Sequence, residues 1–220
     1  MVLVKLSPLW FYGYGVGLEL GFAFISLIVA LFAFRVYRRT SQRYVKLFGI
    51  SFLLISISYF VQSIFNFLII KKLNEPISRM MKLYSVVTFD NLGMITHIIF
   101  MTLGLAILAY ITFKEKKYRL LWLLIVSPLL AIFFSRNMLY IFYLFASIYL
   151  IFIEWHFITN YIKNKKTTTL LIAIAFLLLL FGNFHFLFGV NHQLFYVLGH
   201  IFELVAYLLI LTNFYLVLKK

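Results

Sequence analysis

Long apolar runs, separated by short segments rich in lysine and arginine, make up nearly the whole chain. A helix of about 20 apolar residues crosses the hydrocarbon core of a bilayer. A helix also satisfies its own backbone hydrogen bonds, which lipid cannot do. The pattern therefore predicts an all-α membrane protein: one integral membrane domain, built as a seven-transmembrane-helix bundle. The expected spans are residues 9–34, 45–70, 88–113, 120–134, 138–162, 168–190 and 193–217.

Composition supports a membrane protein over a soluble domain. Of the 220 residues, 65% are hydrophobic and 12% are charged, with a mean hydropathy of +1.04. Soluble domains are typically about 45–50% apolar. The sequence contains no cysteine, which excludes disulfides, thiolate metal ligands and thiol nucleophiles.

The net charge of +14 would suggest a nucleic-acid partner in a soluble protein. In a membrane protein, basic residues gather in the loops that stay in the cytoplasm, so we expect no nucleic-acid binding. Fourteen of the twenty Lys and Arg residues follow the first, third, fifth and seventh apolar runs. This bias predicts an N-terminus outside and a cytoplasmic C-terminus. The richness in Ile, Lys and Phe indicates a prokaryotic source, so we expect a multi-pass protein of a prokaryotic plasma membrane.

Three glycines in the first run, Gly13, Gly17 and Gly21, repeat every four residues. This small-residue pattern predicts a close approach to another membrane helix. In the second run, Ser51, Ser58, Gln62 and Asn66 form a polar stripe that we expect to join helices rather than to bind a ligand. The segment that follows Pro76 predicts a short helix along the membrane interface.

The last apolar stretch, residues 191–215, carries His200 and Glu203 near its middle. On a helix these two residues share a face, which extends backwards to Tyr196 and Gln193. An ionisable side chain in a bilayer costs about 2.5–3.5 kcal/mol on insertion scales, so it usually faces other protein and often marks a site. This stretch is therefore the best candidate to carry the function.

Other polar residues are expected at a similar depth. With an outside N-terminus, most of the intramembrane acidic and histidine side chains fall in the outer half of the bundle, and Glu154 falls in the inner half. This convergence predicts a polar ligand pocket open to the outside. Its candidate residues are Glu19, Asp90, His97, Asn183, His185, Gln193, Tyr196, His200 and Glu203.

The segment GHIFELVAYLLIL, residues 199–211, resembles the final helix of multi-helix membrane sensor domains of microbial signalling proteins. The resemblance implies a sensory module. Because the chain stops shortly after this helix, any output is expected to pass through a separate partner protein. Seven spans also suggest a retinal protein, but the lysines nearest to this stretch are Lys219 and Lys220 at its very end, so retinal is excluded as a cofactor.

Three functions follow from these observations. The leading hypothesis is a non-enzymatic, small-ligand-binding or sensory module, in contact with the lipid bilayer. The second is a zinc-dependent intramembrane hydrolase, with His97, His185, His200 and Glu203 as metal ligands, since zinc binds imidazole and carboxylate groups. The third is a proton- or cation-coupled carrier that uses Glu19, Asp90, Glu203 and Glu154 as a relay.

Overall fold

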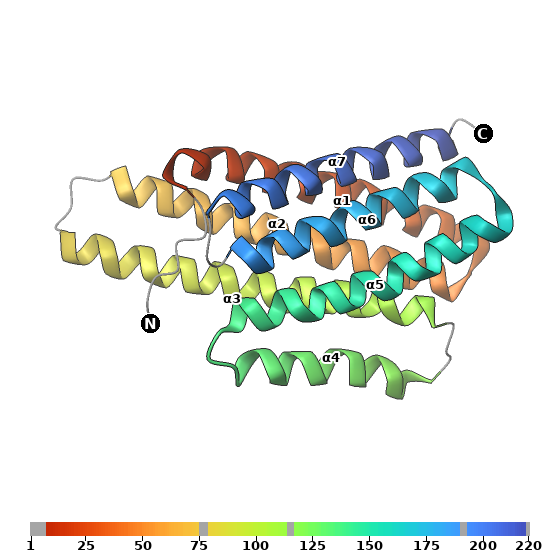
Figure 1. Cartoon of the computed structure of the whole chain (residues 1–220), viewed down its shortest axis with the longest axis horizontal. Coiled ribbons are helices and arrows are strands. Elements are labelled where there is room, and N and C mark those ends of the chain that lie inside the picture. The colour runs from red at the N-terminus through yellow and green to blue at the C-terminus, as the bar shows by residue number, and fades with distance from the viewer. Residues whose placement is uncertain (1–7, 75–78, 114–116, 190–192, 219–220) are drawn as a thin grey trace.

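The computed structural model describes residues 8–74, 79–113, 117–189 and 193–218, and these residues are almost entirely helical (Figure 1). A short 3-10 helix, Leu9–Phe11, precedes the first long helix. The described parts of the chain contain no strand, which confirms the all-α prediction. The helices are α1 (Tyr12–Thr40), α2 (Arg43–Asn74), α3 (Arg79–Thr112), α4 (Tyr118–Phe133), α5 (Met138–Asn164), α6 (Thr167–Gly189) and α7 (Gln193–Leu218).

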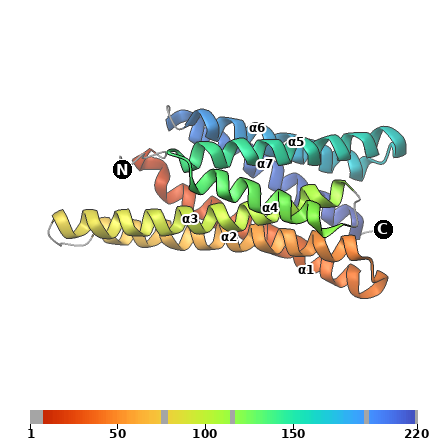
Figure 2. The same ribbon diagram turned by 90° about the horizontal axis from the view of Figure 1, so that it is seen from below.

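The helices lie side by side along one long axis and alternate in direction (Figures 1 and 2). Six of them form a closed ring in the order α1, α2, α3, α5, α6, α7, with α7 returning to α1. Helix α4 packs outside this ring, against α3 and α5. At one end of the bundle α2 and α3 project beyond the other helices, and we call this the hairpin end; the C-terminus lies at the opposite end (Figure 1).

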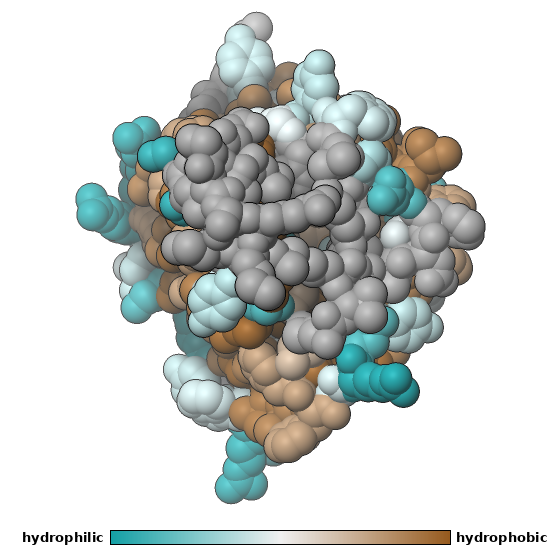
Figure 3. Space-filling model, turned by 90° about the vertical axis from the view of Figure 1, so that its left-hand side faces the viewer, coloured by the Kyte–Doolittle hydropathy of each residue, from teal (hydrophilic) through white to brown (hydrophobic). Residues whose placement is uncertain are grey.

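Within the described residues, six helices are long and apolar enough to cross a membrane, namely all except α4. Helix α4 has 16 residues, which correspond to about 24 Å at 1.5 Å per residue. Large apolar side chains such as Phe24, Trp155 and Leu208 are exposed on the outer faces of the bundle, where lipid would cover them. Seen from the hairpin end, hydrophilic side chains project around the outline of the bundle, with apolar surface between them (Figure 3). The chain is therefore a helical, multi-pass membrane protein.

Tight turns set the ends of two helices. Ser41 and Lys165 adopt left-handed backbone conformations, with φ of 54° and 52°. In each case the backbone N–H bonds to a carbonyl of the last helical turn, from Ser41 to Tyr37 and from Lys165 to Tyr161. Such caps satisfy carbonyl groups that the end of a helix leaves free. They allow α1 to turn directly into α2, and α5 into α6.

The predicted close packing of Gly13, Gly17 and Gly21 is wrong. A Cβ atom added at any of these glycines would meet no atom within 4 Å, so the stripe lies in open space on the surface. The close approaches occur elsewhere: a Cβ on Gly104 of α3 would lie 2.7 Å from Cγ1 of Ile55 on α2. Regular spacing identifies the face that small residues share, but it does not show whether another helix covers that face.

The predicted interfacial helix after Pro76 is also not separate. Residues 75–78 lie outside the described part of the chain, but α3 is continuous from Arg79 to Thr112. No proline or glycine interrupts the sequence between Arg79 and Thr88. The segment therefore lengthens α3 at the hairpin end instead of forming a helix of its own.

Candidate functional site

The centre of the candidate site is a hydrogen-bonded group that joins α2 to α7. The hydroxyl of Tyr59 donates to Oε1 of Glu203 at 2.8 Å. The second carboxylate oxygen, Oε2, lies 3.2 Å from Nδ1 of His200, which stands one turn earlier on α7. The exposed fractions are 3% for Tyr59, 4% for His200 and 9% for Glu203. Both oxygens of this buried carboxylate are therefore occupied by protein groups.

Aromatic rings surround the imidazole of His200. The ring centroids of Tyr196 and Phe186 lie 4.6 and 5.0 Å from it, and those of Phe11 and Phe22 lie 5.7 and 6.3 Å away. The second ring nitrogen, Nε2, is buried and has no hydrogen-bond partner among the described residues. A buried polar atom without a partner costs about 1–3 kcal/mol of stability. Such atoms are rare in native proteins, and they can mark a functional site.

A second buried carboxylate lies nearby on α1. Both oxygens of Glu19 lie 2.9 Å from the side-chain amide nitrogen of Asn66 on α2, which donates to them. Glu19 is close enough to Glu203 for the two carboxylates to interact electrostatically. The ring of Phe22, one turn after Glu19, stacks on Tyr207 with 4.8 Å between centroids and contacts Tyr59. The two carboxylates therefore belong to one buried region between α1, α2 and α7.

His97 of α3 borders the same region. Its Nδ1 lies 2.9 Å from Oγ of Ser58, which also lies 3.0 Å from the backbone oxygen of His97. The His97 ring packs edge-on against Tyr59, with 5.6 Å between centroids. We define the polar cluster by the residues that these contacts connect on α1, α2, α3 and α7. They are Glu19, Ser58, Tyr59, Asn66, His97, His200 and Glu203.

Several predicted pocket residues lie outside the polar cluster. Asn183 is buried, and its amide donates to Oγ of Ser147 and to the backbone oxygen of Tyr143, so it joins α6 to α5. His185 faces a different direction: Nδ1 lies 2.7 Å from the oxygen of Phe181 on its own helix. Its ring packs on Phe202. Asn183 and His185 are two positions apart on α6, and two side chains with this spacing cannot both point inwards.

The remaining predicted residues lie nearer the hairpin end. Asp90 is partly buried on α3, two turns before His97, and Gln193 is exposed at the start of α7. Tyr196 belongs to the aromatic surroundings of His200 and also contacts Phe11. The last residue of the expected sixth span, 190, and the two residues after it lie outside the described part of the chain.

The polar cluster contains residues that the sequence did not single out as ligand candidates. Tyr59 reads as one more aromatic residue in an apolar run, although it is the hydrogen-bond donor to Glu203. Asn66 and Ser58 belong to the polar stripe of the second run, which does join helices: their partners are Glu19 on α1 and His97 on α3. The stripe was the available signal that this helix faces polar groups.

A metal centre finds no support in this arrangement. Within residues 8–74, 79–113, 117–189 and 193–218, no three His, Asp or Glu side chains are grouped so that they could hold a metal ion. His200 and Glu203 lie within 3.2 Å of each other, whereas His185 packs against the outer aromatic side chains of α7. The four residues proposed as zinc ligands therefore do not form a ligand set here.

No family model matches the chain, and no curated protein or solved structure is significantly similar to it. The function is therefore inferred from the chemistry of the polar cluster. That cluster offers two carboxylates whose described partners are an amide, a hydroxyl and an imidazole. Such a group can bind a hydrogen-bond donor or a positive charge, and it can exchange protons.

Proposed function

We propose that the chain is a non-enzymatic, small-ligand-binding or sensory module of a prokaryotic plasma membrane, and that the polar cluster is its ligand site. The observation that carries this proposal is the buried Nε2 atom of His200, which has no partner among the described residues although it lies beside Glu203. Ionisable side chains within membrane helices are expensive and are usually retained for function. Two acidic residues and two histidines belong to this one cluster.

The hydrogen-bond network indicates the chemistry of the ligand. Nδ1 of His200 faces a carboxylate oxygen of Glu203, an arrangement that favours a proton on Nδ1. Nε2 is then the acceptor nitrogen of the neutral ring. A ligand that donates a hydrogen bond, or that carries a positive charge, complements both this nitrogen and the nearby carboxylates.

We further propose that all seven helices cross the membrane, with the hairpin end outside. Helices α3 and α5 run in the same direction (Figure 1), so the chain must return between them, and α4 is the helix that connects their opposite ends. A short span is accommodated by local thinning of the bilayer. The excess of basic residues at the opposite end favours a cytoplasmic C-terminus. The polar cluster then lies in the extracytoplasmic half.

The test uses the purified protein in lipid nanodiscs, with ammonium, methylammonium and guanidinium chloride as probes and sodium chloride at equal ionic strength as the control. We expect at least one probe to raise the melting temperature of the parent and to leave the double variant His200→Phe with Glu203→Leu unchanged. Mass spectrometry of small molecules that co-purify with each protein provides a second measurement. If the parent and the double variant respond alike to every probe and carry the same molecules, the polar cluster is not the ligand site.

A proton- or cation-coupled carrier is the second candidate, and Glu154 favours it. This residue lies in the C-terminal half of α5, is 5% exposed, and its Oε2 has no partner among the described residues. A proton relay across the membrane needs ionisable groups at more than one depth, and Glu154 lies at a different depth from the polar cluster. In vesicles with an imposed pH gradient, Glu154→Gln should abolish gradient-driven proton flux if the chain is a carrier. A sensory module would show no such flux in either protein.

A further inference from the structure

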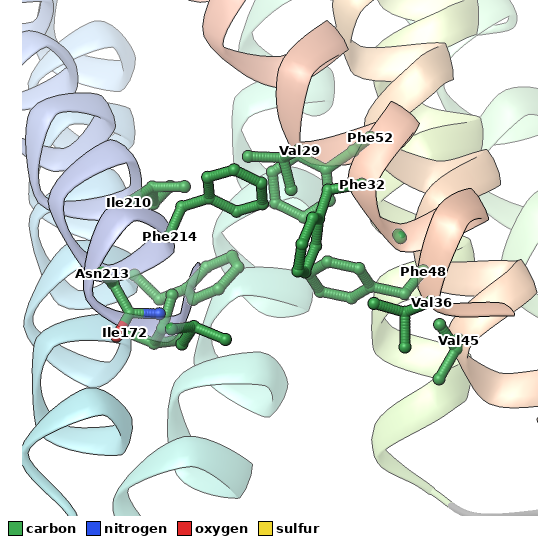
Figure 4. Close-up of a pocket in the computed structure, with 13 residues that line it drawn as sticks. Val29, Phe32, Val36, Val45, Phe48, Phe52, Ile172, Ile210, Asn213 and Phe214 are labelled. Carbon is green, nitrogen blue, oxygen red and sulfur yellow. The ribbon is translucent and has the colours of Figure 1, made fainter. Parts of the chain in front are cut away.

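An apolar cleft lies in the half of the bundle opposite to the polar cluster, between α1 and α2 on one side and α6 and α7 on the other (Figure 4). Its volume is about 220 Å³, and all of its lining residues except Asn213 are apolar. They include Val29, Phe32 and Ala33 of α1, Phe52 of α2, Phe176 of α6 and Phe214 of α7. A cavity of about 150 Å³ with a similar lining stays dry and holds a benzene molecule. This cleft is large enough for several methylene groups.

The cleft follows from the way that α1 and α7 separate along their length. Towards the hairpin end they are held together by the stacked rings of Phe22 and Tyr207. About three turns further along α1, the contact is reduced to the edge of Phe32 against Phe214, with 4.3 Å between centroids. The space beside this aromatic pair is bounded by Phe48 and Phe52 of α2 and by Ile172 of α6. It therefore lies at a depth where lipid chains surround the bundle.

Basic residues stand at the end of this cleft. Val29, Phe32 and Val36 line it from one face of α1, and the same helical spacing places Arg39 on that face one turn later. Arg39 is exposed, as are Arg35 and Arg38. Arg43 is engaged elsewhere, because its guanidinium lies 4.4 Å from the centroid of the Tyr118 ring and bonds to the hydroxyl of Tyr110. Among the three exposed arginines of α1, Arg39 is thus the one on the face that lines the cleft.

We propose that this cleft is a binding site for one hydrocarbon chain of an anionic lipid, with the lipid head group at Arg39. An apolar cavity at membrane depth selects a hydrocarbon chain, and the cation at its end selects a negative head group. Guanidinium groups bind phosphate oxygens in a bidentate manner. A zwitterionic lipid also carries a phosphate, but its own cation cancels that charge, so the attraction to an arginine favours the anionic lipid. This site is separate from the polar cluster and does not depend on the function proposed for it.

The experiment uses the full chain in phosphatidylcholine nanodiscs that contain a trace of phosphatidylglycerol with a photoreactive diazirine near the end of one acyl chain. Phosphatidylcholine with the same diazirine is the second probe. After irradiation, the fraction of labelled protein and the labelled peptides are measured by mass spectrometry. We expect phosphatidylglycerol to label the cleft segments of α1 and α7 several-fold more than phosphatidylcholine does.

Three variants separate this site from ordinary lipid contact. Ala33→Trp fills the cleft and should reduce the labelling of its peptides at least fivefold. Arg39→Gln should lower phosphatidylglycerol labelling to the phosphatidylcholine level and leave the latter unchanged. Leu31→Trp is the matched control, since Leu31 lies on the outer face of α1 and is 59% exposed; its labelling should equal that of the parent. Should Ala33→Trp fail to fold, Val217→Phe narrows the cleft from α7, where Val217 is 44% exposed.

Equal labelling of the parent and of the variant that fills the cleft would mean that the probes report only bulk lipid, and would overturn the proposal. Equal labelling by the two lipids, unaffected by Arg39→Gln, would overturn the preference for an anionic head group. A second copy of the chain could also occupy the cleft. In that case Ala33→Trp would convert a dimer to a monomer in analytical ultracentrifugation, and the lipid site would be rejected.

Discussion

The hydroxyl of Tyr59 on α2 donates a hydrogen bond of 2.8 Å to Glu203 on α7, a residue 144 positions later in the sequence. The two helices are not neighbours in the ring, because α1 lies between them in its order. The bond therefore reaches across the interior of the bundle. In a bilayer no bulk water is available to replace such a partner, so the conformations of α2 and α7 are coupled through this contact.

The first prediction removes this bond. Tyr59→Phe keeps the ring but leaves Oε1 of Glu203 buried without its donor. Loss of a single partner from a buried acceptor costs about 1–3 kcal/mol, so we expect a lower melting temperature in detergent. Tyr14→Phe, at a side chain that is 67% exposed, is the control and should melt like the parent. Indistinguishable melting of the two variants would contradict the assigned hydrogen bond.

The second prediction compares single and double changes at His200 and Glu203. Replacement of His200 alone, by Phe, leaves Oε2 of Glu203 buried without its donor, and an unsatisfied buried acceptor costs about 1–3 kcal/mol, or more when it is charged. Replacement of both residues, by Phe and Leu, removes the unpaired charge as well. We therefore expect the double variant to be more stable than His200→Phe in thermal unfolding. A double variant that is less stable than the single one would mean that the two residues do not act as a pair.

The helical fold could be predicted from the sequence because few backbone structures satisfy their own hydrogen bonds within lipid. Each apolar run had to form a helix, and the structure places a helix within every expected span. The shared face of His200 and Glu203 followed from their spacing, and the two side chains do meet. Local periodicity was sufficient for both inferences, because both concern residues within one helix.

Contacts between helices could not be obtained in the same way. Depth in the membrane grouped His185 with His200, but rotation about the axis of α6 turns His185 towards Phe195 and Phe202 of α7. The partners of Glu203 and Glu19 lie on α2, at Tyr59 and Asn66. These partners depend on the order of helices in the ring, which hydropathy does not encode.

The third prediction concerns glycine packing. A Cβ on Gly199 of α7 would lie 2.5 Å from Cε1 of Phe186 on α6, whereas a Cβ on Gly17 of α1 would meet no atom within 4 Å. Gly199→Leu should therefore overpack the contact between α6 and α7, at a cost of about 1–3 kcal/mol or more. Gly17→Leu should leave the melting temperature unchanged. The reverse order of stability would show that the exposed glycine stripe of α1 is covered in the membrane.

The last prediction tests both the orientation of the chain and the role of α4. Because the sequence contains no cysteine, single cysteines introduced at Asn74, Arg136 and Asn164 can be labelled without background. Asn74 ends α2, Arg136 lies between α4 and α5, and Asn164 ends α5. With seven spans and an outside N-terminus, an impermeant maleimide should label positions 74 and 136 in intact cells, and position 164 only after the membrane is permeabilised.

Each alternative topology gives a different result in this experiment. If the orientation is reversed, position 164 is labelled in intact cells and positions 74 and 136 are not, which would move the polar cluster to the cytoplasmic half. If α4 does not cross, the chain has the six spans that its long helices provide, and positions 74 and 164 then lie on the same side, opposite to position 136. Labelling of 74 and 164 together would thus reject the seven-span topology. It would also contradict the parallel course of α3 and α5 (Figure 1), because α5 would then cross the bilayer in the direction opposite to α3.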